Sequence, residues 1–299
     1  MARLEWEGLP LTVRRAVSAH TGTVSGAHSP PAGRGSDLAT TLHTATGLLF
    51  CKGIRVDEPT TWTHRAEAAL NPHLPDVVPR LLWTVEVAGW LLLGFEHIAG
   101  RHADLGPDSP DLPMVADAVT VLQRENRAAR EVSLRRFADR LTTIAPWTRL
   151  RDDPPLDLPT WQRERLDEFV DAQAAAARAT DGESVIHADL HPLNILVADK
   201  ARVVDWAWAS RAARWVDLEL LGIRLVVAGH TPAAARAWLT EKFSAPVDPG
   251  IRWAFAITMC GLWEYRSRSA PAGHWPFLVA AARAWARHHD PSARSTVDG

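Results

Sequence analysis

The most informative part of the chain reads Val185-Ile-His-Ala-Asp-Leu-His-Pro-Leu-Asn-Ile-Leu-Val197 and continues, after three residues, as Ala201-Arg-Val-Val-Asp-Trp206. Polar side chains stand here between runs of Val, Ile and Leu. They are His187, Asp189, His191, Asn194 and Asp205. Buried strands accept polar groups where those groups bind a ligand or satisfy one another. The segment therefore predicts a functional site on a short polar hairpin.

The residues before this hairpin have mostly β character up to about residue 100. Two apolar runs, Leu38–Thr44 and Leu48–Val56, flank Ala45-Thr46-Gly47 and predict a hairpin with glycine at its turn. Strands are also predicted at Thr21–Ala27, Val78–Val85 and Trp90–Phe95, and a short helix at Thr63–Leu70.

After Gly100 the spacing of apolar residues is mostly helical. Helices are predicted at Met114–Arg130, Trp161–Arg178, Asp217–Ala228, Ala233–Phe243, Ile251–Arg266 and Phe277–His288. We therefore expect an α+β protein of two lobes. Residues 1–98 form a small β-rich lobe, and residues 99–299 form a larger, mainly helical lobe that contains the polar hairpin.

Composition excludes several classes of protein. The chain has 299 residues, is 46% hydrophobic and carries a formal net charge of -2, which is typical of a globular protein and untypical of a nucleic-acid binder. Its two cysteines favour a reducing compartment. The first residues lack the apolar run of a signal peptide, and the longest apolar stretch, Trp90–Phe95, is too short for a bilayer. We expect a cytoplasmic protein with no nucleic-acid, membrane or protein partner.

The polar hairpin has the spacing of a kinase catalytic loop. Asp189 and Asn194 are five residues apart, and Asp205 ends the next strand, where kinases place a metal-binding Asp. The stretch His187-Ala-Asp-Leu-His-Pro-Leu-Asn194-Ile-Leu resembles the H-G-D-L-H-P-G-N-I-L motif of the aminoglycoside phosphotransferase and choline-kinase-like branch of the protein-kinase-like superfamily. Asp205-Trp206 and Asp217-Leu218 resemble that family's downstream motifs. The likeness spans about residues 20–270, with Ala188 and Leu193 in place of two glycines.

The resemblance implies a bilobal protein-kinase-like fold and ATP-dependent transfer of phosphate to a hydroxyl of a small molecule. Asp189 is then expected to accept the hydroxyl proton or orient the hydroxyl. Asn194 and Asp205 are expected to hold Mg²⁺, since hard oxygen ligands suit a hard cation. His187 and Asp217 are expected to support the loop, Asp217 by accepting hydrogen bonds from its backbone.

The first lobe is expected to bind the nucleotide. Lys52 lies in an apolar strand and is one of only three lysines, so its place there is informative, although a lysine can also extend from an edge strand to water. In the resembled family such a lysine pairs with the α- and β-phosphates and with a helix glutamate. Glu67 is the expected partner, and Glu58 is the weaker candidate.

Two further segments are assigned to ATP by position. Gly33, Gly35 and Ser36 precede the strand that starts at Leu38, where a phosphate-covering loop belongs. The connector that includes Glu96 and Ile98 is expected to offer backbone groups to adenine, with the lobes meeting near residues 96–100. No Walker A motif is present.

Two other classes of function remain open from the sequence. His187, Asp189 and His191 alternate and would share one face of a strand, as zinc or iron ligands of a metal-dependent hydrolase do. A nucleotide-binding protein without phosphotransfer is the other class. The joint presence of Lys52, Asp189, Asn194 and Asp205 argues against it.

The acceptor is expected to be an aminoglycoside-like antibiotic, with a role in antibiotic resistance. Residues 151–220 carry 8 basic and 14 acidic side chains, a balance of -6, which would attract a cation. Asp181, Glu183 and Glu264 are the candidate acceptor-binding residues. Residues 221–299 carry 9 basic and 5 acidic side chains, a balance of +4, which argues against a polycation. The alternative is a metabolic kinase of the choline, homoserine or sugar-amine type.

Overall fold

The chain divides into two units, which are described here in a computed structural model. The structure describes all residues except 1–3, 31–34, 125–127, 270–272 and 295–299. The first unit comprises Met1–Ala103, Pro113–Ser133 and Pro192–Ala209, and the second comprises Asp104–Leu112, Leu134–His191 and Ser210–Gly299.

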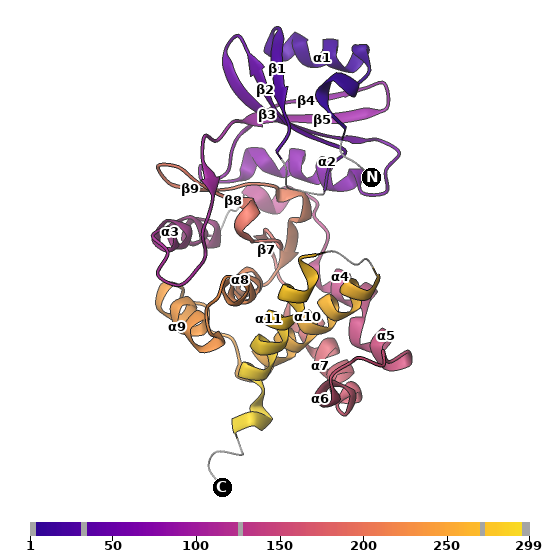
Figure 1. The fold of residues 1–299 in the computed structure, drawn as a ribbon, viewed down its shortest axis with the longest axis vertical. Helices are drawn as coiled ribbons and strands as arrows, with labels where there is room; N and C mark the ends of the chain where they lie inside the picture. The colour runs from indigo at the N-terminus through magenta and orange to yellow at the C-terminus, as the bar shows by residue number, and fades with distance from the viewer. Residues whose placement is uncertain (1–3, 31–34, 125–127, 270–272, 295–299) are drawn as a thin grey trace. The chain divides into compact units, whose positions relative to one another are not determined.

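The first unit is built on an antiparallel sheet of five strands in the order β1-β2-β3-β5-β4. The strands are β1 (Val24–His28), β2 (Leu38–Thr44), β3 (Gly47–Arg55), β4 (Leu81–Val87) and β5 (Trp90–Glu96). Helix α1 (Leu11–Thr21) and helix α2 (Thr61–Leu70) lie on opposite sides of the sheet (Figure 1). Val13 and Val17 of α1 join Leu42 and Leu92 in one core, whereas Ala68 of α2 packs with Leu93 on the other face.

The first unit also contains the polar hairpin. Strands β8 (Ile195–Val197) and β9 (Ala201–Val203) pair antiparallel, and β6 (Arg101–His102) pairs with β8. Helix α3 (Leu112–Gln123) belongs almost entirely to the same unit. The hairpin thus returns the chain to the unit that holds β3 and α2.

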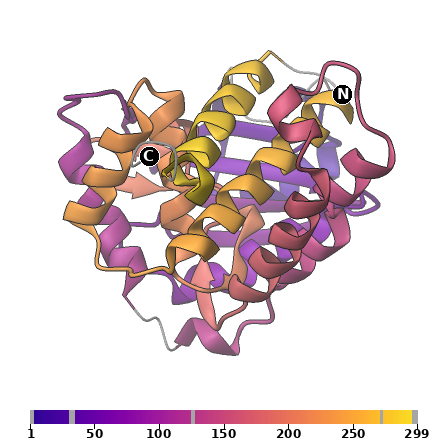
Figure 2. The same cartoon turned by 90° about the horizontal axis from the view of Figure 1, so that it is seen from below.

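The second unit is mainly helical. Its helices are α4 (Phe137–Ile144), α5 (Pro146–Asp152), α6 (Thr160–Arg163), α7 (Leu166–Ala179), α8 (Trp215–Val227), α9 (Pro232–Lys242), α10 (Pro249–Ser269) and α11 (Trp275–His289). Strands β7 (Ser184–Ile186) and β10 (Ser210–Ala212) pair antiparallel. Helices α7, α10 and α11 lie side by side (Figure 2), around buried rings such as Trp147, Phe169 and Phe255.

The predicted fold class is confirmed: an antiparallel sheet occupies the N-terminal part and helices occupy the C-terminal part. Helices α1, α4 and α5 were not predicted. Ala145, in the left-handed conformation, and Pro146 separate α4 from α5, so each is too short to show a helical period. The predicted helix Trp161–Arg178 is two helices, α6 and α7. Within the described residues, no helix has the length and apolar character needed to cross a membrane.

Candidate active site

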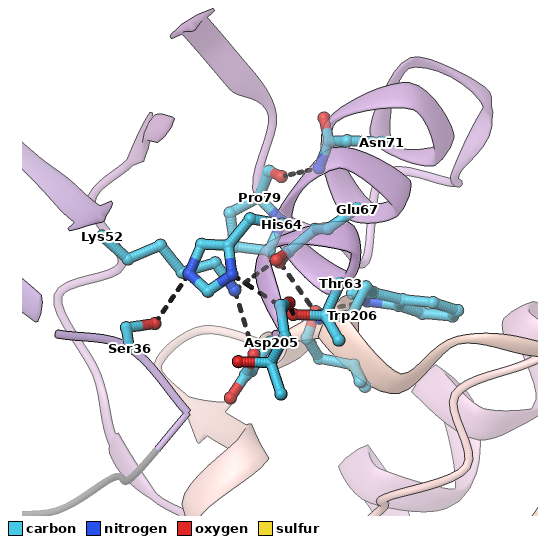
Figure 3. Close-up of polar contacts among 11 residues, drawn as sticks. Ser36, Lys52, Thr63, His64, Glu67, Asn71, Pro79, Asp205 and Trp206 are labelled. Carbon is cyan, nitrogen blue, oxygen red and sulfur yellow. Dashed lines mark hydrogen bonds and ion pairs between the residues drawn. The ribbon is translucent and has the colours of Figure 1, made fainter. Parts of the chain in front are cut away.

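A buried lysine with two carboxylate partners is the centre of polar contacts in the first unit (Figure 3). Lys52, on β3, forms an ion pair with Glu67 on α2, and its Nζ lies 2.9 Å from Oδ1 of Asp205. Its ammonium group also lies 5.7 Å from the centre of the Phe95 ring. Burial opposes the charged form of Lys52, but the two carboxylates outweigh it and raise the pKa of Lys52. Glu58 is not among its partners.

Glu67 connects this lysine to the residue that follows Asp205. Its Oε1 accepts a hydrogen bond from the backbone N–H of Trp206 at 3.1 Å. Asp205 itself has a φ of 62°, a left-handed conformation that aspartate tolerates better than most residues. The helix α2 therefore fixes both the ammonium group and the turn that presents the Asp205 carboxylate.

Asn194 lies close to Asp205 through the pairing of β8 with β9. The carbonyl of Asn194 accepts a hydrogen bond from the N–H of Val204 at 2.9 Å. The Asp205 side chain is 44% exposed, so a ligand can reach it. An amide oxygen and a carboxylate are donors that Mg²⁺ takes in proteins, so these two residues fit the predicted metal.

A histidine that the sequence analysis missed lies beside Lys52. His64 of α2 is buried, with Nε2 2.9 Å from the Ser36 hydroxyl and Nδ1 3.2 Å from the Thr63 hydroxyl (Figure 3). Burial first, and the charge of Lys52 second, lower the pKa of His64 to about 3. Its neutral ring thus connects Ser36, in the predicted phosphate loop, to α2. In the sequence, the only indication that His64 belongs to the site is that it lies three residues before Glu67 on the same predicted helix.

The other residues predicted to bind ATP differ in how far the structure places them. Gly33 lies outside the described residues. Gly35 has open space where a side chain would begin. Glu96 ends β5, where its side chain and its N–H pair with the backbone of Arg80, and the carbonyl of Ile98 accepts a hydrogen bond from Gly100.

In the second unit, Asp217 holds the start of the loop that carries Asp189. Its two carboxylate oxygens accept hydrogen bonds from the backbone N–H groups of His187 and Ala188, at 2.7 and 2.8 Å. Nδ1 of His187 then accepts the N–H of Asp189 at 3.2 Å. Ala188 has a φ of 63°, the left-handed region that favours glycine, which is the residue of the resembled motif at this position.

The Asp189 carboxylate has basic neighbours. Nη2 of Arg224 lies 3.4 Å from its Oδ1, and Nε2 of His191 lies 3.5 Å from its Oδ2. Burial alone would raise the pKa of Asp189, but the hydrogen bond and charge of His191 and the charge of Arg224 outweigh it and hold the pKa well below its usual value. Asp189 is therefore ionised at neutral pH. Arg224 could not be identified from the sequence, because helical spacing does not show which loop a side chain on α8 reaches.

The three candidate acceptor residues are already paired with arginines. Glu264 is fully buried, with Oε1 2.5 Å from Arg283 and Oε2 3.5 Å from Arg268. Asp181 and Glu183 both bind the guanidinium of Arg136, at 2.5 and 2.7 Å. This placement argues against Glu264 as a contact for the acceptor, whereas Asp181 and Glu183 are exposed carboxylates that share one arginine.

The structure also bears on the metal-hydrolase interpretation. Across the described part of the chain, no three His, Cys, Asp or Glu side chains are grouped so that they could hold a metal ion, and this includes His187, Asp189 and His191. Asp189 instead pairs with Arg224, and His187 uses a ring nitrogen on the backbone of its own loop.

The fold and these contacts define a class of protein. A buried strand lysine paired with a helix glutamate, followed along the chain by an Asp-x₄-Asn loop and a second Asp, is typical of phosphotransferases of the protein-kinase type. A family profile described as the phosphotransferase enzyme family matches residues 52–253. The chain therefore belongs to that family. This membership confirms the resemblance and the predicted enzyme class, an ATP-dependent phosphotransferase.

Solved structures share the fold at low sequence identity. An aminoglycoside phosphotransferase from Alicyclobacillus acidocaldarius has a TM-score of 0.64 and 15% identity, covering 100% of this chain and 98% of its own. A spectinomycin phosphotransferase in complex with ADP and spectinomycin has a TM-score of 0.56 and 11% identity, covering 94% of each chain. An aminoglycoside phosphotransferase from Streptomyces rimosus in complex with ADP and streptomycin has a TM-score of 0.56 and 19% identity, covering 83% of this chain and 96% of its own. No curated protein matches the sequence.

Proposed function

We propose that this enzyme transfers the γ-phosphoryl group of ATP to a hydroxyl of a small molecule, with Asp189 facing that hydroxyl. The observation that carries the proposal is the buried Lys52, which contacts both Glu67 and Asp205. A charged lysine in an apolar strand needs such partners, and it supplies a fixed cation for the α- and β-phosphates.

The nucleotide is assigned to residues 1–98 and to the hairpin that carries Asn194 and Asp205. Mg²⁺ held by these two residues would supply positive charge that offsets the negative charge of the phosphates. Gly33, Gly35 and Ser36 would cover the phosphates, and the backbone near Glu96 and Ile98 would receive adenine. Catalysis and acceptor binding are assigned to residues 99–299.

The ionised Asp189 has the chemistry that the transfer step requires. Its carboxylate accepts a hydrogen bond from the acceptor hydroxyl and orients the oxygen toward the γ-phosphorus. As the new O–P bond forms and the bond to the bridging oxygen of ADP breaks, the hydroxyl proton passes to Asp189. The low pKa of Asp189 favours a late proton transfer, so orientation is its main contribution.

Two acceptor classes are proposed. An aminoglycoside-like antibiotic, and with it a role in resistance, is supported by the structural neighbours that bind spectinomycin and streptomycin. A metabolic small-molecule kinase is supported by the pairing of Glu264, Asp181 and Glu183 with arginines, which leaves these carboxylates poorly placed to bind a cation.

The proposed site of action is the cytoplasm. Both cysteines are free and buried, which fits action in a reducing compartment.

Replacing the proposed base tests the mechanism. Asp189→Ala is expected to lower acceptor-dependent ATP consumption by about 10²–10⁴-fold, because the hydroxyl loses its orienting partner. Its affinity for ATP should stay near that of the wild type, whereas Lys52→Met should weaken ATP binding. Asp199→Ala, at an exposed aspartate in the turn between β8 and β9, is the matched control. Full turnover in Asp189→Ala would contradict the assignment.

The acceptor class is tested by expressing the chain in a susceptible bacterial host. Protection against aminoglycosides that is lost in Asp189→Ala supports the antibiotic acceptor. Turnover of a metabolite without protection supports the metabolic kinase.

A further inference from the structure

The described end of the predicted phosphate loop is anchored at two successive residues. The Ser36 hydroxyl lies 2.9 Å from Nε2 of His64 on α2 (Figure 3). Oδ2 of Asp37 accepts the N–H of Arg55, at the end of β3, at 2.9 Å, and the carbonyl of Asp37 accepts the N–H of Leu4 at 2.7 Å. The chain therefore enters β2 from a segment that is fixed to both α2 and β3.

Hydrogen-bond accounting assigns the proton on the His64 ring. The Thr63 hydroxyl has one proton and lies 2.8 Å from the carbonyl of Thr60, a shorter contact than its 3.2 Å to Nδ1 of His64. That proton is therefore assigned to the bond with Thr60, and the Thr63 oxygen accepts Nδ1–H. Because a neutral ring carries one N–H, Nε2 is an acceptor and the Ser36 hydroxyl donates to it.

The same helix holds the lysine that is assigned to the phosphates. Glu67, three residues after His64, lies on the same face of α2 and forms the ion pair with Lys52. Lys52 lies opposite Ala39 in the pairing of β3 with β2, three residues beyond Ser36. One turn of α2 therefore sets the position of Ser36 relative to the Lys52 ammonium group.

The imidazole ring of His64 is a polar group in a core position. His64 is fully buried, and an apolar side chain of similar size would pack there without the cost of removing two ring nitrogens from water. Of its two hydrogen bonds, only the one to Ser36 joins α2 to another segment of the chain. The ring therefore fits a role in holding Ser36.

We propose that His64 is a positioning residue for the nucleotide: by binding the Ser36 hydroxyl, it holds the backbone of Gly35 and Ser36 beside Lys52 to receive the phosphates of ATP or ADP. This inference rests on the proposed nucleotide site and adds a residue to it. Successive backbone N–H groups in a turn can bind phosphate oxygens. Within the described residues, a Cβ at Gly35 would meet no atom within 4 Å, so a ligand has room beside this backbone.

Calorimetric binding of ADP and of adenosine, which differ only in the phosphates, tests this role on the full chain. His64→Leu and Ser36→Ala are each expected to raise Kd for ADP about tenfold, the effect of one lost hydrogen bond, and to leave Kd for adenosine unchanged. His64→Gln, whose Oε1 can accept from Ser36, should bind ADP within about threefold of the wild type. His102→Leu, at an exposed histidine of β6, is the matched control and should change neither constant.

A double-mutant cycle distinguishes an effect through Ser36 from two independent effects. If His64 acts through Ser36, His64→Leu combined with Ser36→Ala binds ADP no more weakly than either single variant. Losses that multiply to about a hundredfold would overturn the inference. If His64→Leu does not fold, His64→Asn takes its place in the cycle, because its amide can face Thr63 but is too short to reach Ser36.

These measurements do not depend on turnover, so they keep this inference separate from the proposed transfer. A loss confined to ADP supports the role of His64 even if no acceptor is phosphorylated, in which case only the transfer fails. Equal ADP binding by the wild type, His64→Leu and Ser36→Ala, or an equal loss for ADP and adenosine, overturns the inference and leaves the transfer intact. A wild type that binds neither ATP nor ADP overturns both.

Discussion

Asp217 shows how one side chain orders the loop that carries Asp189. It is buried, and both of its oxygens accept backbone N–H groups of the residues that precede Asp189. Asp217→Asn replaces one acceptor with an NH₂ group, which leaves a buried backbone donor without a partner. We expect a loss of about 1–3 kcal/mol in the free energy of unfolding, measured by chemical denaturation, together with a lower kcat. Asp199→Asn is the control, and equal stability of the two variants would contradict the role of Asp217.

Ala188 carries a conformational cost that the sequence motif already suggests. The resembled motif has glycine at this position, and Ala188 has a φ of 63°. Ala188→Gly removes the clash of Cβ in the left-handed region and should raise the free energy of unfolding by up to about 1 kcal/mol. Ala174→Gly, on the exposed face of α7, should instead lower it by about 0.5–1 kcal/mol. Thermal unfolding of both variants measures the difference, and a loss at both positions would show that the strain is absent.

At the scale of residues, sequence reasoning identified those whose type is unusual for their surroundings. Lys52 stands out in an apolar strand, and Glu67 is on the next helix, so the pair could be expected. His64 and Arg224 lie on helices with ordinary spacing. What they contact depends on how helices cross, and a single sequence does not contain that information.

Strand β5 shows how an element depends on one glycine. Gly94 pairs with Trp83 of β4, and a Cβ at Gly94 would overlap the indole ring of Trp83. His20 of α1 stacks on the same indole, so the ring cannot simply move away. We expect Gly94→Ala to lower the free energy of unfolding by about 1–3 kcal/mol in denaturant titrations.

A glycine elsewhere in the same sheet provides the control for this prediction. A Cβ at Gly26 of β1 would be 3.8 Å from the nearest atom of His43, an ordinary contact. Gly26→Ala should therefore leave the protein as stable as the wild type, or slightly more stable. Similar losses at both glycines would show that the indole of Trp83 can repack.

At the scale of elements, alternation of apolar residues predicted the strands of the sheet well, because a turn such as Ala45-Thr46-Gly47 marks each hairpin. Helix α1 was missed, since Pro10 precedes it without a side-chain cap and the apolar positions Val13 and Val17 alone give a weak period. The short strands β7 and β10 pair across 23 residues of sequence between them, and no local signal indicates that partner.

For the molecule as a whole, the uneven charge along the chain was visible from the sequence, but its meaning was not. The acids of residues 151–220 suggested a cation site, yet several of them bind arginines or backbone groups in the structure. The balance of +4 in residues 221–299 includes Arg224, whose guanidinium lies 3.4 Å from the Asp189 carboxylate, a contact that the charge count alone does not reveal.

The stability of the whole protein should fall in mild acid because of His64. The pKa of His64 is lowered to about 3 by burial, and an unfolded chain restores it to about 6.5. Below pH 6.5 the unfolded state therefore binds a proton that the folded state does not, and the free energy of unfolding drops by up to about 1.4 kcal/mol per pH unit until pH 3. Between pH 7.5 and pH 5 we expect His64 alone to contribute a loss of about 2 kcal/mol. Denaturant titrations at pH 7.5 and pH 5 measure this loss.

His64→Gln, which keeps a polar group for Ser36, should remove most of this loss, whereas His102→Gln, at an exposed histidine of β6, should retain it. An equal loss in wild type and His64→Gln would assign the acid sensitivity to other groups.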